Sequence, residues 1–139
     1  MVETVHIPIF ANGDINDLDS AILAAEKSGS DGLMIGRGAI GQPWIFSCML
    51  GKELPSIDER LVVMNEHLDA IHSFYGRERG TRVSRKHLMA YFTRLRAPEL
   101  GKEFVSLGTS QEQTAWLRNI DVEMVKSFFS SAEEAAIAA

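Results

Sequence analysis

Two short loops near the start of the chain combine residue types that suit a phosphate group. Asn12-Gly13-Asp14 follows one apolar run, and Gly36-Arg37-Gly38 follows another. Glycines let backbone amides come close to an anion, and an arginine offers a charged fork to its oxygens. Short glycine loops are common, so the same residues also fit a plain turn and a solvated arginine at a strand end. The pattern is consistent with both interpretations.

A second candidate group is a run of cations inside a chain whose formal net charge is −5. Between residues 77 and 96, seven Lys and Arg residues face one acid, a formal +6, whereas the other seven face eighteen acids, a formal −11. At about 100° per residue in a helix, Arg82, Arg85, Lys86 and Arg96 share one face. Cations on one face repel one another, and the phosphates of RNA would neutralise them.

We therefore predict that Arg82, Arg85 and Lys86 contact RNA, with His87 beside them as a weaker candidate. The alternative is a solvated surface whose acids come from neighbouring helices. Candidate acids are Glu66, Asp69 and Glu99. Another face of the same helix is apolar, and we expect it to pack in a core. Its members are Leu88, Tyr91, Phe92 and Leu95.

The remaining reactive side chains give weaker signals. Cys48 is the single cysteine and lies in an apolar segment, which predicts an unreactive thiol and no disulfide. His67, His72 and His87 do not share a helix face with a carboxylate, so we predict no metal site. The chain has 45% hydrophobic and 24% charged residues, as folded globular proteins do. A secretory signal and an apolar run of roughly 20 residues are not evident, which favours a cytoplasmic protein.

The two glycine loops need parallel strands that bring their ends together. The expected order is a strand at 7–11, a helix at 17–28, a strand at 31–35 and a helix that begins near Pro43. Both strands are apolar without alternation, as in a parallel sheet buried on both faces. Asn16 can cap the first helix, and Gly29 suits its left-handed exit. Because two strands leave open edges, we expect either further strands or self-association through those edges.

Residues 51–55 are predicted to form a linker, and residues 56–139 a small helical bundle. Ser56 and Glu59 have the spacing of a capping box, and apolar residues then recur at intervals of three and four up to Gly76. Further helices are expected from 79 or 81 to 96, near 99–106, from about 110, and from 121 to about 136.

Several segments together resemble the tRNA-dihydrouridine synthases, and the bacterial branch is the more similar. These segments are Ile7-Pro-Ile-Phe-Ala-Asn-Gly-Asp-Ile15, Gly32-Leu-Met-Ile-Gly-Arg-Gly-Ala39, Gly41-Gln-Pro-Trp-Ile-Phe46, Tyr75-Gly76, Gly80-Thr-Arg82 and Arg85-Lys86-His87. The likeness covers most of residues 5–96 and fades beyond them. It implies an α/β plus all-α fold. Residues 1–50 would form the final βαβα quarter of a TIM (β/α)8 barrel, and residues 56–139 a helical tRNA-binding domain.

The resemblance also implies an FMN-dependent oxidoreductase that reduces uridine in tRNA to 5,6-dihydrouridine, with NADPH as the source of electrons. Family contacts with FMN carry over to Asn12, Gly13, Asp14, Gly36 and Arg37. Asp14 would either lie near the FMN phosphate or mainly cap the following helix. The family's catalytic cysteine lies in an earlier barrel loop, and Cys48 does not match its motif. We therefore expect the chain to hold only the phosphate end of the flavin site and to be inactive by itself.

Two other functions remain open at this level. One is a non-catalytic RNA-binding module in which the helical bundle acts alone. The other is a phosphate-binding piece of a different flavin barrel. The cationic helix favours the tRNA-dihydrouridine synthase and the RNA-binding module, because other flavin barrels have no need of a basic helical appendage.

Overall fold

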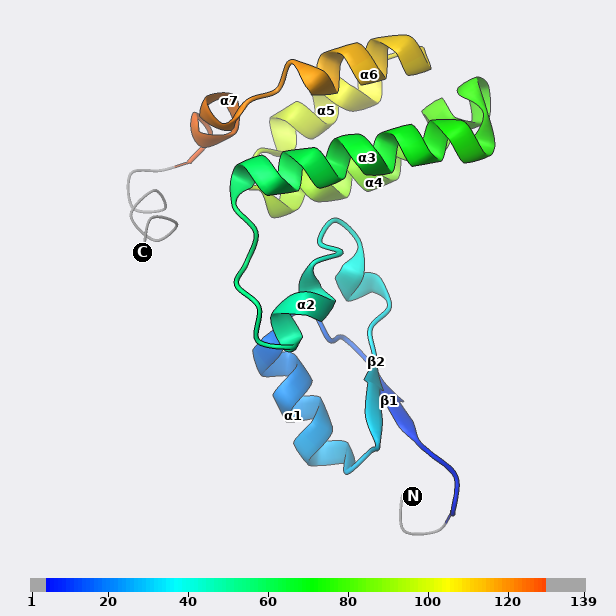
Figure 1. Cartoon of the computed structure of the whole chain (residues 1–139), viewed down its shortest axis with the longest axis vertical. Coiled ribbons are helices and arrows are strands. Elements are labelled where there is room, and N and C mark those ends of the chain that lie inside the picture. The colour runs from blue at the N-terminus through cyan, green and yellow to red at the C-terminus, as the bar shows by residue number, and fades with distance from the viewer. Residues whose placement is uncertain (1–4, 130–139) are drawn as a thin grey trace. The chain divides into compact units, whose positions relative to one another are not determined.

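The computed structural model describes residues 5–129, which fold into two compact units that divide between Leu54 and Pro55. The first unit contains a small sheet with its helices, and the second is helical (Figure 1). The first unit positions the two glycine loops, and the second positions the cationic helix.

The first unit has a strand-helix-strand crossover, as expected. Its elements are β1 (Phe10–Asn12), α1 (Leu18–Ser28), β2 (Gly32–Met34), the 3-10 helix η2 (Arg37–Ala39) and α2 (Ile45–Met49). β1 and β2 are parallel, and Asn12 is in register with Met34. Each strand has three residues rather than the five expected. Just before the strands, the Asp31 N–H donates to the Ile9 carbonyl at 2.9 Å, and the Asp31 carboxylate accepts from the Ile9 N–H at 2.8 Å.

Helix α1 begins one residue later than the sequence predicted. Asp17, not Asn16, is its N-cap: the Asp17 carboxylate accepts from the Ser20 N–H at 2.8 Å, and the Ser20 hydroxyl accepts from the Asp17 N–H at 3.1 Å. This reciprocal pair satisfies two end amides at once, which a single Asn16 cap would not. Gly29 ends the helix with φ at 58°, which confirms the left-handed exit.

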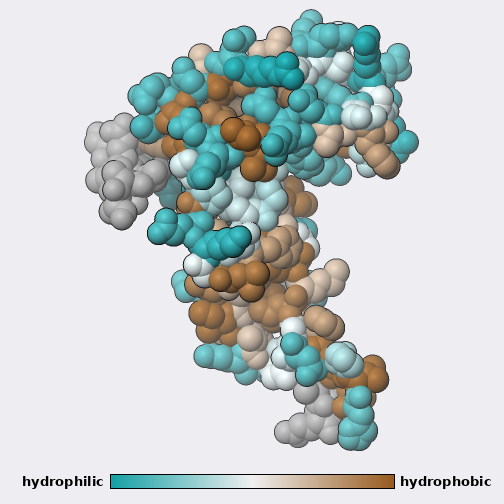
Figure 2. Space-filling view, in the orientation of Figure 1, coloured by the Kyte–Doolittle hydropathy of each residue, from teal (hydrophilic) through white to brown (hydrophobic). Residues whose placement is uncertain are grey.

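Much of the apolar surface of the first unit is exposed. Ile15, Ala21, Trp44 and Ile45 are buried. Many other large hydrophobic side chains of this unit are open, among them Ile7, Phe10, Leu23, Met34, Phe46 and Leu50. Hydrophobic residues gather on the visible surface of this unit in Figure 2. Apolar side chains that flank a parallel sheet are normally covered, so this unit exposes more apolar surface than such a sheet usually does.

The second unit is a helical bundle with a closed core. Its helices are α3 (Ile57–Tyr75), α4 (Arg77–Arg94), α5 (Pro98–Ser106), α6 (Ser110–Arg118) and α7 (Val122–Lys126). Helix α4 packs against both α3 and α5. Fully buried core residues include Met64, Leu68, Leu88, Phe92, Phe104 and Leu117. Burial of each such side chain contributes roughly 1.5–3 kcal/mol to folding.

Local capping defines where α3 begins. The Ser56 N–H donates to the Glu59 carboxylate at 2.7 Å, and the Glu59 N–H donates to the Ser56 hydroxyl at 3.3 Å. These bonds with Ser56 lower the pKa of Glu59, and they confirm the predicted capping box. Gly76 ends α3 with φ at 74°, also as predicted.

Several helix boundaries in the second unit differ from the sequence prediction. Helix α4 begins at Arg77, earlier than expected, and Gly80 lies inside it. It ends at Arg94, so Arg96, which was predicted to share its cationic face, lies beyond the helix with φ at 59°. A Cβ on Gly80 would come within about 3.0 Å of His72, so the missing side chain lets α4 approach α3. Helix α7 ends at Lys126, and the predicted extension past residue 129 lies outside the described residues.

Candidate functional site

The two glycine loops leave the same edge of the sheet, at the carboxyl ends of β1 and β2. Between them lies a cavity of about 520 Å³. Its lining residues are Asn12, Gly13, Asp14, Ile15, Asn16, Gly36, Arg37 and Gly38. All five residues predicted to contact FMN therefore line one cavity, although Asp14 and Gly36 are 22 positions apart in the sequence.

Close backbone contact joins the two loops. A Cβ on Gly38 would collide with the carbonyl group of Ile15, so only glycine fits this approach. Gln42 strengthens the junction, because its Nε2 donates to the carbonyl oxygens of Asn16 at 2.8 Å and Gly38 at 2.7 Å. Sequence reasoning missed Gln42. The sequence does offer a clue, because the segment from Ala39 to Phe46 is otherwise apolar and Gln42 is its one amide side chain.

Two of the residues that line the cavity form an ion pair. Arg37 Nη2 lies 3.0 Å from Asp14 Oδ1, and the two side chains are 88% and 84% exposed. Such an exposed pair contributes little to folding stability. The suggestion that Asp14 mainly caps α1 is wrong, because Asp17 does so and Asp14 faces Arg37 instead. Asp14 adopts a left-handed conformation, with φ at 45°, after Gly13 with φ at 151°.

The chemistry of this cavity fits a phosphate group. Asp14 contacts one terminal nitrogen of Arg37, and a guanidinium has five N–H donors in all. The side chain is open to solvent, so a phosphate can reach it without displacing protein. A Cβ on Gly36 would meet no other atom within 4 Å, so this position leaves room for an anion near the backbone. Asp14 would hold the guanidinium in place and would also reduce the local positive charge.

The four candidate RNA contacts on α4 have different surroundings. Arg82 and Lys86 are exposed, as a surface contact requires. Arg85 is half-buried, and its Nη2 donates to the carbonyl of Leu107 at 3.1 Å. Leu107 is the C-cap of α5, so Arg85 binds the negative end of that helix. The Arg85 Nε is buried and has no hydrogen-bond partner among the described residues.

His87 lies in a partly buried cluster with His67 and Tyr91. The two histidine rings are 5.2 Å apart, and His67 Nδ1 is 3.0 Å from the Tyr91 hydroxyl. Burial lowers the pKa of His67. Burial, then the charges of His67 and Lys86, lower the pKa of His87. Both histidines therefore favour the neutral form, which weakens His87 as a cationic contact for RNA.

The apolar face predicted for α4 is confirmed. Leu88, Tyr91, Phe92 and Leu95 are all buried. Burial raises the pKa of Tyr91 to about 12, so its hydroxyl remains protonated at neutral pH.

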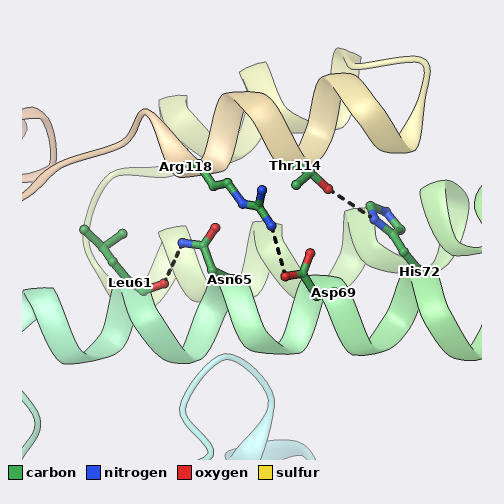
Figure 3. A network of polar contacts seen from close by, with 6 residues as sticks. All are labelled: Leu61, Asn65, Asp69, His72, Thr114 and Arg118. Atoms are coloured by element: carbon green, nitrogen blue, oxygen red, sulfur yellow. Dashed lines mark hydrogen bonds and ion pairs between the residues drawn. The ribbon is translucent and has the colours of Figure 1, made fainter.

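A second cavity, of about 390 Å³, lies between α3, the start of α4 and α6. Sequence reasoning did not find it. Its lining residues are Asp69, His72, Arg77, Ser110, Gln111, Thr114, Ala115 and Arg118. Arg118 Nη2 lies 3.3 Å from Asp69 Oδ2, and Thr114 Oγ1 lies 3.5 Å from His72 Nδ1 (Figure 3). Asp69, proposed as a partner for the α4 cations, pairs with Arg118 instead.

Other reactive groups have unremarkable surroundings. Cys48 is a half-buried free thiol whose Sγ lies 3.9 Å from the Glu53 carbonyl. Within residues 5–129, no group of three or more His, Cys, Asp or Glu side chains is placed to hold a metal ion.

In the same part of the chain, none of the helices has the length and apolar character needed to cross a membrane.

Comparison with known proteins decides the family. The sequence pattern of the dihydrouridine synthase family matches residues 1–130. The chain belongs to this family. The match includes both glycine loops and the helices from α3 to α7.

Curated relatives in the dihydrouridine synthase family agree. The chain is 42% identical over 124 residues to tRNA-dihydrouridine synthase B of Pseudomonas putida, covering 84% of this chain and 37% of that protein. For tRNA-dihydrouridine synthase B of Pseudomonas syringae, identity is 38% over 135 residues, 92% of this chain and 38% of that protein. A probable tRNA-dihydrouridine synthase of Rickettsia typhi is 45% identical over 96 residues, 64% of this chain and 29% of that protein. The chain thus spans less than two fifths of the length of these relatives.

Proposed function

We propose that this chain provides the flavin-phosphate site and an RNA-binding helical domain of a tRNA-dihydrouridine synthase. The complete reaction would be the reduction of uridine in tRNA to 5,6-dihydrouridine, with FMN as cofactor and NADPH as the source of electrons. The observation that supports this most is the cavity in which Asn12, Gly13, Asp14, Gly36 and Arg37 meet at the carboxyl ends of two parallel strands. Active sites of β/α barrels collect at that end, and a phosphate often binds between the last two βα loops.

The first unit would be the final βαβα quarter of a barrel in residues 1–50, joined by residues 51–55 to a tRNA-binding domain in residues 56–139. Supporting this proposal, side chains on both strands, such as Phe10 and Met34, are exposed. Further strands of a barrel would cover them and pair with the open sheet edges. Alternatively, a second copy of the chain would cover these residues. Analytical ultracentrifugation would detect the resulting dimer.

In this proposal each residue of the cavity has a defined task. Arg37 binds the FMN phosphate, and Asp14 holds the guanidinium in position through its 3.0 Å contact. Gly13 and Gly36 keep the approach to the backbone open, while Asn12 orients the first loop. Bound FMN supplies the hydride chemistry, which no side chain of the cavity can provide. The catalytic acid would come from a part of the enzyme outside these residues, so the chain alone should not reduce uridine.

Binding measurements with FMN and riboflavin test the phosphate site, because riboflavin lacks only the phosphate. We expect weak binding of FMN and weaker binding of riboflavin. Arg37→Ala should abolish the difference between them, whereas Lys27→Ala, an exposed cation on α1, should preserve it. Equal affinity for the two ligands in the unaltered chain contradicts the phosphate site. A purified chain that retains one FMN per molecule contradicts the view that only the phosphate end is present.

A non-catalytic RNA-binding module is the second candidate function. The exposure of Arg82 and Lys86 on α4 favours it, since neither needs a flavin to bind RNA. Replacing both with Ala should weaken tRNA binding and reduce the slope of log K against log salt by up to about two. An unaltered chain that does not bind tRNA at low salt would exclude this function.

A further inference from the structure

The corner between α3 and α4, residues 74–79, has an exposed aromatic pair that the core does not use. Phe74 is 83% exposed, and Tyr75 beside it is 37% exposed. Their ring centroids are 4.9 Å apart, and the rings meet nearly edge to face at 80°. A large aromatic side chain this open gains almost nothing for folding, so its stability role is small.

The backbone of this corner is firmly defined. Gly76 turns the chain with φ at 74°, and α4 begins at the next residue. One turn later Gly80 packs against His72 of α3, where a Cβ would be within about 3.0 Å. Because both helices are anchored, little conformational entropy is lost when a ligand meets the aromatic pair.

One cation contacts the aromatic pair, and another begins α4 two residues after Tyr75. The Arg79 guanidinium carbon lies 5.1 Å from the centre of the Tyr75 ring, a cation–π contact. Arg77 lines the cavity between α3 and α6, together with Arg118. Arg77, Arg118 and Asp69 give that cavity a formal charge of +1, and its other lining residues are neutral polar side chains and one alanine, with His72 counted as uncharged. A single phosphodiester carries the opposite charge.

We propose that the α3–α4 corner binds an unpaired nucleotide of RNA, whose base stacks on Phe74 and Tyr75 while Arg77 holds an adjoining phosphate. The inference rests on the proposed RNA-binding function and assigns to it residues other than Arg82, Arg85, Lys86 and His87. Unpaired bases stack on aromatic side chains and on arginine, whereas bases inside an RNA helix are not accessible in this way. If the ligand were a phosphate without a base, binding would depend on Arg77 and not on Phe74. A protein partner would need more apolar surface than two rings flanked by Arg77, Glu78 and Arg79.

The test compares binding of a single-stranded RNA oligonucleotide and of its duplex by the full chain. Stacking is worth about 1–3 kcal/mol per base, so Phe74→Ala should weaken single-strand binding by about 5- to 150-fold and leave duplex binding unchanged. Phe74→Trp should retain the affinity. Val62→Ala is the matched control, because Val62 is an exposed apolar residue elsewhere on α3. Thermal melts should be the same for all these variants.

Salt dependence separates the two parts of the site. Phe74→Ala removes no charge, so the slope of log K against log salt should not change. Arg77→Ala removes one phosphate contact and should reduce that slope by about 0.7. Unchanged single-strand affinity in Phe74→Ala overturns this inference alone. The inference is also overturned if Phe74→Ala loses affinity equally for the single strand and the duplex. It is likewise overturned if the loss of affinity arises because the protein changes from a dimer to a monomer. Failure of the unaltered chain to bind any RNA overturns both the inference and the RNA-binding function.

Discussion

The two units differ in how completely they cover their hydrophobic residues. In the helical unit, Leu68, Phe92 and Phe104 are fully buried. In the first unit, Phe10 is 64% exposed and Leu50 is 85% exposed. The helical unit can therefore hold its shape through its own core, whereas the first unit depends more on backbone contacts and on surface that another partner would cover. Phenylalanine and leucine thus belong to a core in one unit and are exposed in the other.

The largest expected effect tests the core of the helical unit. Phe92 is fully buried and packs edge-on against Trp116 at 5.7 Å, so Phe92→Ala should lower the free energy of unfolding by about 3–5 kcal/mol. Phe46→Ala, at a half-exposed position in the first unit, should change it by less than about 1 kcal/mol. Urea unfolding followed by circular dichroism measures both. Similar losses for the two variants would mean that the units do not differ in this way.

The next effect tests the backbone contact in the first unit. Gly38→Ala puts a Cβ against the Ile15 carbonyl and should destabilise this unit by about 1–3 kcal/mol. It should also remove the preference for FMN over riboflavin, because the two loops must separate. Gly108→Ala is the control, since its Cβ would meet only the Glu112 carboxylate at 3.5 Å. Fluorescence of Trp44 in a Trp116→Phe background reports the first unit. If the first unit of Gly38→Ala unfolds at the same urea concentration as that of the unaltered chain, the close contact is contradicted.

A smaller effect distinguishes two arginines on α4. Arg85 donates to the Leu107 carbonyl, so Arg85→Ala should lower the stability of the helical unit by about 1 kcal/mol. Arg82 is exposed, and Arg82→Ala should leave stability within about 0.5 kcal/mol of the original while weakening tRNA binding. Thermal melts and tRNA titrations of both variants give the comparison. If Arg85→Ala loses RNA affinity and keeps full stability, its main partner is RNA and not Leu107.

The smallest effect is a dependence of stability on pH. Burial lowers the pKa of His67 and of His87 below the ordinary value of 6.5. The unfolded chain then binds protons more readily than the folded chain, so stability is full above pH 6.5 and falls as the pH drops below that value. His67→Gln should make the loss between pH 7 and pH 5 shallower. Urea midpoints measured across this range test the sign, and a rise in stability on acidification would contradict it.

Local sequence patterns predicted much of the helical architecture. Ser56 and Glu59 are three residues apart, and their mutual hydrogen bonds need no other part of the chain. Gly29 and Gly76 likewise mark helix ends through their own backbone conformations. The cap of α1 shows the limit of this reasoning, because Asn16 and Asp17 both suit the position and only the geometry of Ser20 selects Asp17. The resemblance to the dihydrouridine synthases, which rested on short motifs in order, was confirmed by the family match.

By itself, the sequence determined the family, the helix ends set by neighbouring residues, and the two loops whose composition suits a phosphate. Tertiary structure alone decided that Gln42 bridges the loops, that Arg85 binds Leu107, and that Phe74 remains exposed. The physical reason is distance along the chain. A cap is formed by atoms within four residues of one another, whereas the Arg85–Leu107 bond joins residues 22 apart, and its formation depends on how whole helices pack.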